Sequence, residues 1–280
     1  MMKSLRSRFN IDPLAQSQAR IAQWFSTPLG RRMLFHERKT LSEELRYLFG
    51  YHFMQLSPVA NVNFGSASRI NHCISMSPAV SGLDDKNSSI DGVSDFCDLP
   101  FDDDVIDVTV LHHVLEFSEN PHQVLKEAAR VTIPRGYIII VAFNPISLSG
   151  LFQPLGALLN FSSISRRRLL RAGRMKDWLE FLDFTCLSTK QVFHNLPINN
   201  ARFLASTRVL ERFKYKNKMP MGMSFVMVAR KDKAGLTPIK PKWEKGNLLG
   251  AMPIAKQAIR ANAAKEGLVL PFRTKIKREF

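Results

Sequence analysis

Residues 99–117, LPFDDDVIDVTVLHHVLEF, bring together the side chains of this sequence that are best suited to chemistry. Four aspartates precede or enter an apolar run, and two histidines and a glutamate follow it: Asp102, Asp103, Asp104, Asp107, His112, His113 and Glu116. These residue types are compatible with a metal site, with an acid–base site, or with the edge of a cofactor pocket on a parallel sheet.

The histidine pair does not predict a metal site. Adjacent residues of a strand point to opposite faces, so His112 and His113 are expected not to grip one ion. No HExxH or comparable spacing completes a zinc ligand set. The run Asp102–Asp104 is typical of a charged turn before a strand. We therefore expect a charged loop rim and no metal ligands.

Asp98 has a different position, because it closes a weak predicted strand at residues 90–98. In an open parallel sheet, ligands bind beyond the carboxyl ends of the strands, where the strand order reverses. A carboxylate there can accept a hydrogen bond from an exocyclic amine, which suits an adenine ring. Leu99 and Phe101 would supply apolar walls.

The elements that must position these residues alternate along the chain. Short runs rich in apolar and β-branched residues predict strands, a Pro-Arg-Gly turn is expected at 134–136, and amphipathic spacing predicts helices. We expect strands at 51–57, 69–76, 90–98, 105–114, 137–144, 185–192 and 223–231, and helices at 12–25, 28–48, 118–131, 149–159, 165–173, 174–184 and 201–213. This alternation favours an α/β fold with a mostly parallel sheet and helices on both faces.

An ordered set of short motifs resembles the class I S-adenosylmethionine-dependent methyltransferases, in particular the type 11 group. The motifs are D-L-P-F from Asp98, L-H-H-V-L-E-F from Leu111, P-H-Q-V-L-K-E-A-A-R-V from Pro121, and P-R-G-Y-I-I-I-V-A-F-N-P from Pro134. W-F-S-T-P-L-G from Trp24 and F-N-P-x-S-L from Phe143 match a narrower bacterial branch. The resemblance covers residues 20–230 and implies a Rossmann-like seven-stranded sheet.

The resemblance also implies S-adenosylmethionine as cofactor and a pocket lined by residues that follow the first strands. Carried over by position, the cofactor-binding residues are Gln55, Leu56, Ser57, Asp98, Leu99, Leu111 and His112, and Ser75, a polar residue near the end of the second strand, is added to them. The chain departs from the family's pattern in the first loop, which is usually glycine-rich so that the backbone can approach the ligand. Here that loop reads Q-L-S-P-V-A-N-V-N-F-G, and the acidic residue that usually ends the second strand is missing.

Composition sets the domain organisation and the compartment. The 280 residues carry a net charge of +16, and residues 230–280 hold thirteen Lys/Arg against four Asp/Glu. We expect an N-terminal helical extension at 1–49, a methyltransferase-like domain at 50–231 and a basic tail at 232–280. The three scattered cysteines, the absence of a secretory signal and the lack of an apolar run long enough to span a bilayer predict a cytoplasmic protein.

Two functions stay open on the sequence. The first is methyl transfer to an unknown acceptor, with Arg166, Arg167, Arg168, Arg171 and Arg174 available to hold an anionic substrate. The second is a methyltransferase-like protein without turnover, whose basic tail binds RNA or another acidic surface. No catalytic base is named, because methyl transfer depends on positioning and desolvation more than on a strong base.

Overall fold

The structure is a computed structural model that describes residues 14–59, 62–79, 90–147, 167–194 and 222–232. These residues belong to one compact unit, Met1–Ala234, and the second unit, Gly235–Phe280, lies outside them. The helices expected at 149–159 and 201–213 and the basic tail from residue 233 onward also fall outside the described residues. Among the described helices, none combines the length and the apolarity needed to cross a bilayer.

Two helices precede the sheet, as predicted: α2 at Leu14–Phe25 and α3 at Pro28–Leu45. The corner between them explains the motif W-F-S-T-P-L-G. Thr27 caps α3 by accepting a hydrogen bond from the Gly30 N–H at 3.2 Å, and Pro28 occupies the first helical turn. A Cβ on Gly30 would lie 2.4 Å from the Trp24 carbonyl oxygen, so the tight corner requires glycine there.

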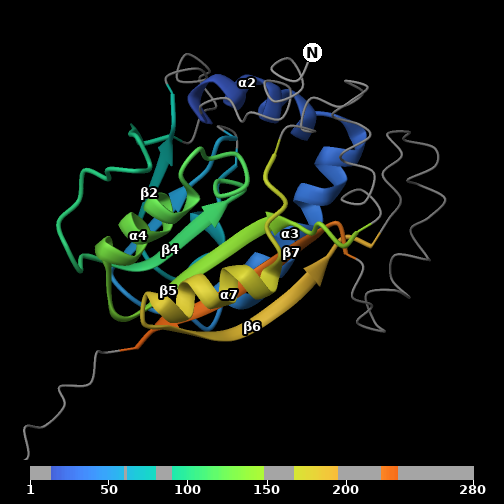
Figure 1. The fold of residues 1–280 in the computed structure, drawn as a ribbon. Helices are drawn as coiled ribbons and strands as arrows, with labels where there is room; N and C mark the ends of the chain where they lie inside the picture. Colours follow the sequence, from blue (N-terminus) through green and yellow to red (C-terminus); the bar gives the residue numbers. More distant parts are fainter. Residues whose placement is uncertain (1–13, 60–61, 80–89, 148–166, 195–221, 233–280) are drawn as a thin grey trace, which may run out of the picture. The chain divides into compact units, whose positions relative to one another are not determined.

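The seven strands form one sheet with the order β3-β2-β1-β4-β5-β7-β6 (Figure 1). Every neighbouring pair from β3 to β5 is parallel, whereas β7 runs antiparallel to both β5 and β6. The strand order reverses between β1 and β4, which is where open α/β sheets form their ligand crevice. The strands are β1 His52–Leu56, β2 His72–Ser77, β3 Gly92–Val93, β4 Ile106–His112, β5 Thr132–Phe143, β6 Phe184–Val192 and β7 Ser224–Lys231.

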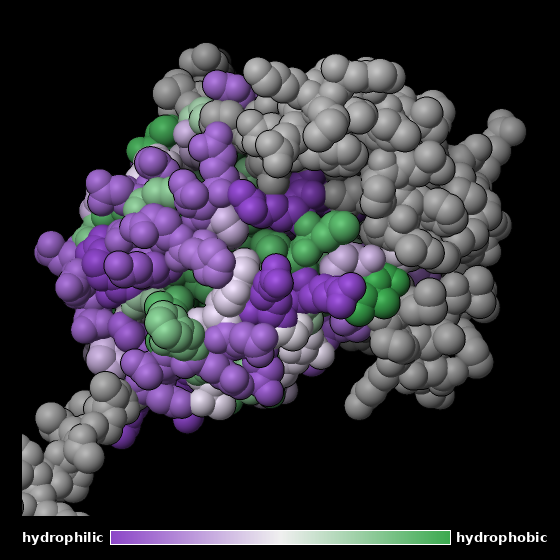
Figure 2. All heavy atoms as spheres, viewed as in Figure 1, coloured by the Kyte–Doolittle hydropathy of each residue, from purple (hydrophilic) through white to green (hydrophobic). Residues whose placement is uncertain are grey.

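Helices cover both faces of the sheet, as predicted. Side chains of α2 and α3 share one apolar core with Phe53 of β1, while Met54 and Leu56 face a second core built with α4 (Pro121–Val131) and α7 (Ala172–Phe181). Figure 1 shows α4 and α7 on the near side of the sheet. The face seen in Figure 2 is mostly hydrophilic, because these two helices turn their apolar sides inward.

Three local predictions are wrong. The helix expected at 165–173 is absent from its described residues 167–171, and α7 begins at Ala172. The third strand covers only Gly92–Val93, since residues 96–97 form a turn and the chain bends at 98, and Asp98 therefore lies five residues beyond the strand end. The expected Pro-Arg-Gly turn lies inside β5, where Arg135 adopts φ 67° and the register with β4 shifts between Ile106 and Val108. A bulge absorbs the irregular residues without ending the strand.

Candidate functional site

A buried cluster of charged and polar side chains lies at the carboxyl end of β4. Glu37 of α3 contacts two histidines: its Oε2 lies 3.4 Å from His112 Nε2, and its Oε1 lies 3.1 Å from His113 Nε2. Glu116 completes the cluster, with Oε1 2.7 Å from His113 Nδ1. All four residues are almost fully buried. We call Glu37, His112, His113 and Glu116 the buried cluster.

The two histidines converge because the backbone breaks its strand geometry between them. His112 is the last residue of β4, and His113 adopts φ 52°, in the left-handed region that non-glycine residues rarely occupy. The His113 N–H still donates to the Val141 carbonyl at 2.9 Å, which holds this turn against β5. The expectation that the adjacent histidines face opposite sides is therefore wrong, because strand alternation stops at His112.

The surroundings shift the pKa values of Glu37, His112 and His113 in different directions, so these residues differ in protonation state. Burial by itself raises the pKa of Glu37, but the charge of His113 and the hydrogen bonds from both imidazoles outweigh it and lower the pKa to about 2. Burial opposes protonation of His113, yet Glu37 and Glu116 raise its pKa to about 9. For His112 burial prevails and lowers the pKa. At neutral pH, Glu37 is ionised, His113 is charged and His112 is neutral.

Arg167 provides a further positive charge beside the cluster. Its guanidinium carbon lies 4.3 Å from the centre of the Phe143 ring, in a cation–π arrangement. Burial lowers the pKa of Arg167 to about 10, and the Glu116 carboxylate opposes that shift. Oε2 of Glu116 is buried and accepts no hydrogen bond from the described residues, so the charge of Arg167 compensates it through space.

The first loop is tied to the sheet by Gln55 and Ser57. The Gln55 side chain donates to the Val62 carbonyl and accepts from the Phe64 N–H at 2.8 Å. Ser57 Oγ lies 3.1 Å from His112 Nδ1 and accepts from the Val59 N–H at 3.1 Å. Two of the expected cofactor-binding residues, Ser57 and His112, are thus in direct contact across the reversal between β1 and β4.

The other expected cofactor-binding residues fall into three groups. Ser75 is buried within β2, and its Oγ lies 3.5 Å from the Gln55 amide nitrogen. Leu56 and Leu111 are buried in the core shared with α4 and α7. Leu99 is also buried there, and its N–H lies 3.4 Å from Glu127 Oε2. Asp98 is exposed, and its carboxylate contacts no other expected site residue among those described.

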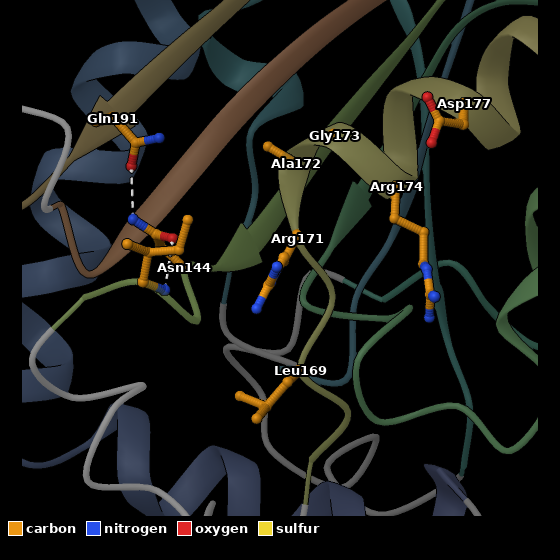
Figure 3. A pocket seen from close by; sticks show the side chains of 9 residues that line it. Asn144, Leu169, Arg171, Ala172, Gly173, Arg174, Asp177 and Gln191 are labelled. Carbon is orange, nitrogen blue, oxygen red and sulfur yellow. Dashed lines mark hydrogen bonds between the residues drawn. The ribbon is translucent and has the colours of Figure 1, made fainter.

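A separate cavity of about 760 Å³ opens at the carboxyl ends of β5 and β6, beside the first turn of α7 (Figure 3). Its polar lining includes Asn144, Gln191, Arg171, Arg174 and the carboxylate of Asp177, and the two arginine side chains extend to the same side of the loop that leads into α7. Both arginines are exposed. Two cationic side chains next to a helix N-terminus favour an anionic ligand.

The remaining arginines expected to hold a substrate have other positions. Arg168 donates to the Glu119 carbonyl at 2.7 Å and to the Ser118 carbonyl at 3.2 Å, so it holds the loop after β4. Arg167 lies by the buried cluster, and Arg166 lies outside the described residues. Only Arg171 and Arg174 line the cavity.

Asn144 gives the motif F-N-P-x-S-L a structural role. Its amide nitrogen donates to Gln191 Oε1 at 3.1 Å and to the Gly222 carbonyl at 2.9 Å, while its Oδ1 accepts from the Ile146 N–H at 3.0 Å. One side chain therefore joins the end of β5 to β6 and to the start of β7. It also fixes one wall of the cavity.

The functional residue that sequence reasoning missed is Glu37. A signal for it exists, because Met33, Glu37 and Leu41 are spaced four residues apart on the buried stripe of α3. A carboxylate on such a stripe must find a partner, since burying an unpaired charge is costly. Its partners, His112 and His113, lie 75 and 76 residues away in sequence.

Comparison of sequences places the chain among methyltransferases. Residues 68–140 match a family described as "Methyltransferase domain". The uncharacterized protein YafS of Escherichia coli (strain K12) is 30% identical over 176 residues, which cover 63% of this chain and 70% of that protein. The family match includes β2, β3, β4 and α4, and therefore both histidines of the buried cluster.

Solved structures share the fold. A Thermotoga maritima S-adenosylmethionine-dependent methyltransferase, described as a possible histamine N-methyltransferase, has a TM-score of 0.56 at 16% identity and covers 75% of this chain and 94% of that one. A Haloferax volcanii putative methyltransferase, in complex with the Trm112 activator, has a TM-score of 0.54 at 15% identity, covering 77% and 97%. The [4+2]-cyclase SpnF has a TM-score of 0.52 at 15% identity, covering 80% and 98%.

The sequence matches, the strand order and the antiparallel β7 agree with the family expected from the motifs. The chain belongs to the type 11 group of the class I S-adenosylmethionine-dependent methyltransferases.

Proposed function

We propose that the protein binds S-adenosylmethionine and transfers its methyl group to an acceptor held in the cavity beside α7. The observation that carries the proposal is the reversal of strand order between β1 and β4, where Ser57 and His112 meet. Ligands of open α/β sheets bind at such a point. In the reaction, the acceptor's lone pair forms a bond to the methyl carbon as the bond from carbon to sulfonium sulfur breaks.

The donor site proposed here uses the loops after the first four strands. Asp98 is exposed, and among the described residues only its backbone is hydrogen-bonded, to Asp95 and Ser94, so its carboxylate is available to accept from the exocyclic amine of adenine. Leu99, the next residue, is buried in the core. The complete proposed set is Gln55, Leu56, Ser57, Ser75, Asp98, Leu99, Leu111 and His112.

The proposed acceptor is anionic. Arg171 and Arg174 supply the positive charge of the cavity, and Asn144 and Gln191 supply hydrogen-bonding groups from the neighbouring strand ends. Such a site would orient the acceptor and exclude water, which is the main requirement of methyl transfer. No base is assigned.

Calorimetric titration with S-adenosylmethionine tests the donor site. We expect binding near micromolar, about −8 kcal/mol. Asp98→Ala should weaken it by about 1.5–3 kcal/mol, the range for a lost hydrogen bond to a charged group. Asp102→Ala is the matched control, because Asp102 is an exposed aspartate four residues away, and its affinity should equal that of the wild type. Equal loss in both variants would contradict the role given to Asp98.

The first loop favours a second candidate, a methyltransferase-like protein that binds an anionic partner without turnover. Between Ser57 and Phe64 there is no glycine. The Gln55 side-chain amide is already hydrogen-bonded to the backbone of this loop, at Val62 and Phe64. The basic segment 232–280 would then supply the contacts to RNA or another acidic surface. Absence of any heat with S-adenosylmethionine at millimolar concentration would favour this candidate. Deletion of residues 232–280 should leave donor binding unchanged.

A further inference from the structure

Three potential metal ligands of the buried cluster converge from two parts of the chain. Glu37, His112 and His113 each present one ligand atom, and these atoms all lie within 4.8 Å of one another. Among the described residues, three His, Cys, Asp or Glu side chains with ligand atoms this close together are found in this cluster. All three residues have zero relative exposure, so bulk water does not compete for the ligand atoms.

Both imidazoles are oriented as they are in metal sites. A ligating histidine usually donates its second ring N–H to a carboxylate or another acceptor, which fixes the ring. Here His113 Nδ1 lies 2.7 Å from Glu116 Oε1, and His112 Nδ1 lies 3.1 Å from Ser57 Oγ. Each Nδ1 is therefore held from outside, and each Nε2 is turned toward the same carboxylate.

The contacts that the two imidazoles make with Glu37 are longer than an ordinary hydrogen bond between an imidazolium and a carboxylate. A direct bond between an imidazolium and a carboxylate measures about 2.7–2.9 Å, as the contact of His113 with Glu116 does. The contacts with Glu37 are longer, 3.1 Å from His113 and 3.4 Å from His112. Two ligands of one tetrahedral zinc ion, each about 2.0–2.1 Å from the metal, lie about 3.3 Å apart. The Glu37 contacts have that spacing.

We propose that Glu37, His112 and His113 form a binding site for a divalent transition-metal ion, with Zn²⁺ as the first candidate. Two imidazoles and one carboxylate suit zinc and iron, whereas Mg²⁺ and Ca²⁺ prefer sites built from oxygen ligands. The ion would bind the two Nε2 atoms and the Glu37 carboxylate, and the Nε2 proton of the charged His113 would be released to solvent as the metal binds. Glu116 and Ser57 would serve as the outer partners that orient the rings.

The surroundings can satisfy the hydrogen bonds of the loaded site. With the metal on Nε2, His113 keeps its Nδ1–H for Glu116, and His112 donates its Nδ1–H to Ser57. The Ser57 hydroxyl can then donate to the Val59 carbonyl, 3.4 Å away. No buried donor in this chain of contacts is left without an acceptor. The ion would fasten α3 to the end of β4.

The test uses the full chain without an affinity tag, stripped with a chelator and titrated with Zn²⁺ in a calorimeter. We expect one ion per chain, and visible absorption bands of low-coordinate Co²⁺ when cobalt replaces zinc. Glu37→Gln and His112→Gln should abolish this binding. Glu116→Gln should weaken it about 10–100-fold, the usual effect of removing an outer partner. Metal analysis of protein purified without chelator distinguishes zinc from iron.

The control is a second histidine pair far from the cluster in sequence. His52 and His72 lie at the starts of β1 and β2, are solvent-accessible, and have Nδ1 atoms 2.7 Å apart, so they offer an adventitious surface site. His72→Asn should leave the one-to-one binding intact. Loss of binding in His72→Asn, unchanged binding in Glu37→Gln, or no binding by the wild type would each overturn the proposal.

Folding of the variants is checked separately. Circular dichroism spectra should match that of the metal-free wild type, so that lost binding is not lost structure. Where Glu37→Gln does not fold, the wild type and His72→Asn still decide the question. Zn²⁺ should raise the melting temperature of both and give both the same cobalt spectrum. A shift that disappears in His72→Asn contradicts the proposal.

Discussion

Two charge clusters of this molecule use similar residues in opposite surroundings. The buried cluster holds Glu37, His113 and Glu116 without exposure to solvent. Near the amino end of β4, Arg130 contacts Glu127 at 2.9 Å and Asp103 at 2.6 Å, with 30% of its own side chain and 74% of the Asp103 side chain exposed. We call Glu127, Arg130 and Asp103 the surface cluster.

The comparison shows why short distances alone do not measure stabilisation. The shortest ion pair of the surface cluster, 2.6 Å, is between groups that water and salt screen, and such pairs contribute about 0–1 kcal/mol. The buried contacts measure 2.7–3.4 Å, but removing one partner leaves a buried charge without compensation, which costs about 3–5 kcal/mol. The buried cluster should therefore dominate the electrostatic response of the protein.

The largest expected effect comes from Glu37→Ala. The variant leaves the charged His113 facing only Glu116, so the free energy of unfolding should fall by about 3–5 kcal/mol. Urea denaturation in the presence of a chelator measures it. Lys39→Ala is the control, because Lys39 lies on the exposed side of the same helix and should change stability by less than about 0.5 kcal/mol. Similar losses in the two variants would remove the distinction between the clusters.

An intermediate effect is expected from pH in the metal-free protein. Folding raises the pKa of His113 from 6.5 to about 9, so its contribution is complete below pH 6.5 and is lost as the pH rises through 9. The free energy of unfolding should fall by about 3 kcal/mol across that window. The pH dependence of His112 has the opposite sign, because its pKa is lowered on folding: its contribution is complete above pH 6.5 and is lost as the pH falls from 6.5 through the lowered pKa.

A His113→Asn variant isolates the alkaline loss of stability. The decrease between pH 6.5 and 9 should be absent from its urea-denaturation series, while titration of lysines, tyrosines and cysteines affects both proteins alike. A wild-type curve that stays level over the same window would mean that His113 is neutral in the folded protein.

The smallest effect is expected from Asp103→Asn in the surface cluster. Arg130 keeps its contacts with Glu127 and with the carbonyls of Phe101 and Leu99, so the free energy of unfolding should fall by no more than about 0.5 kcal/mol. The difference should shrink further in high salt, because the pair is screened. A loss comparable to that of Glu37→Ala would contradict the contrast between the clusters.

The sequence was sufficient to predict the elements but not the cluster. Periodicity located α2, α3, α4, α7 and six of the seven strands, because each element repeats its apolar residues at its own period, whereas β3 is limited to Gly92–Val93. The convergence of His112 and His113 depends on one left-handed residue, which no periodicity shows. The contact with Glu37 depends on how α3 packs against the sheet, a long-range arrangement that local spacing does not determine.

Only part of the expected donor site could be predicted from the sequence, because its loop residues also depend on arrangements that local spacing does not determine. The reversal between β1 and β4 follows from the fold class, and it brings Ser57 to His112. The position of Asp98 depended on where β3 ends, and that strand is only two residues long. Residues 94–98 follow the end of this strand and carry Asp98 away from it. Sequence periodicity does not fix the end of so short a strand, and so it does not fix the position of the carboxylate that follows.

The span of the Glu37 contacts has a consequence for synthesis on the ribosome. The helix that carries Glu37 emerges first, yet its two imidazole partners are 75 and 76 residues further along the chain. The Glu37 carboxylate on the apolar side of α3 therefore has no imidazole partner until β4 has left the exit tunnel, and α2 and α3 cannot complete their packing before then. During that interval the nascent chain exposes apolar surface that chaperones recognise, and the order of translation becomes part of how this edge of the sheet is assembled.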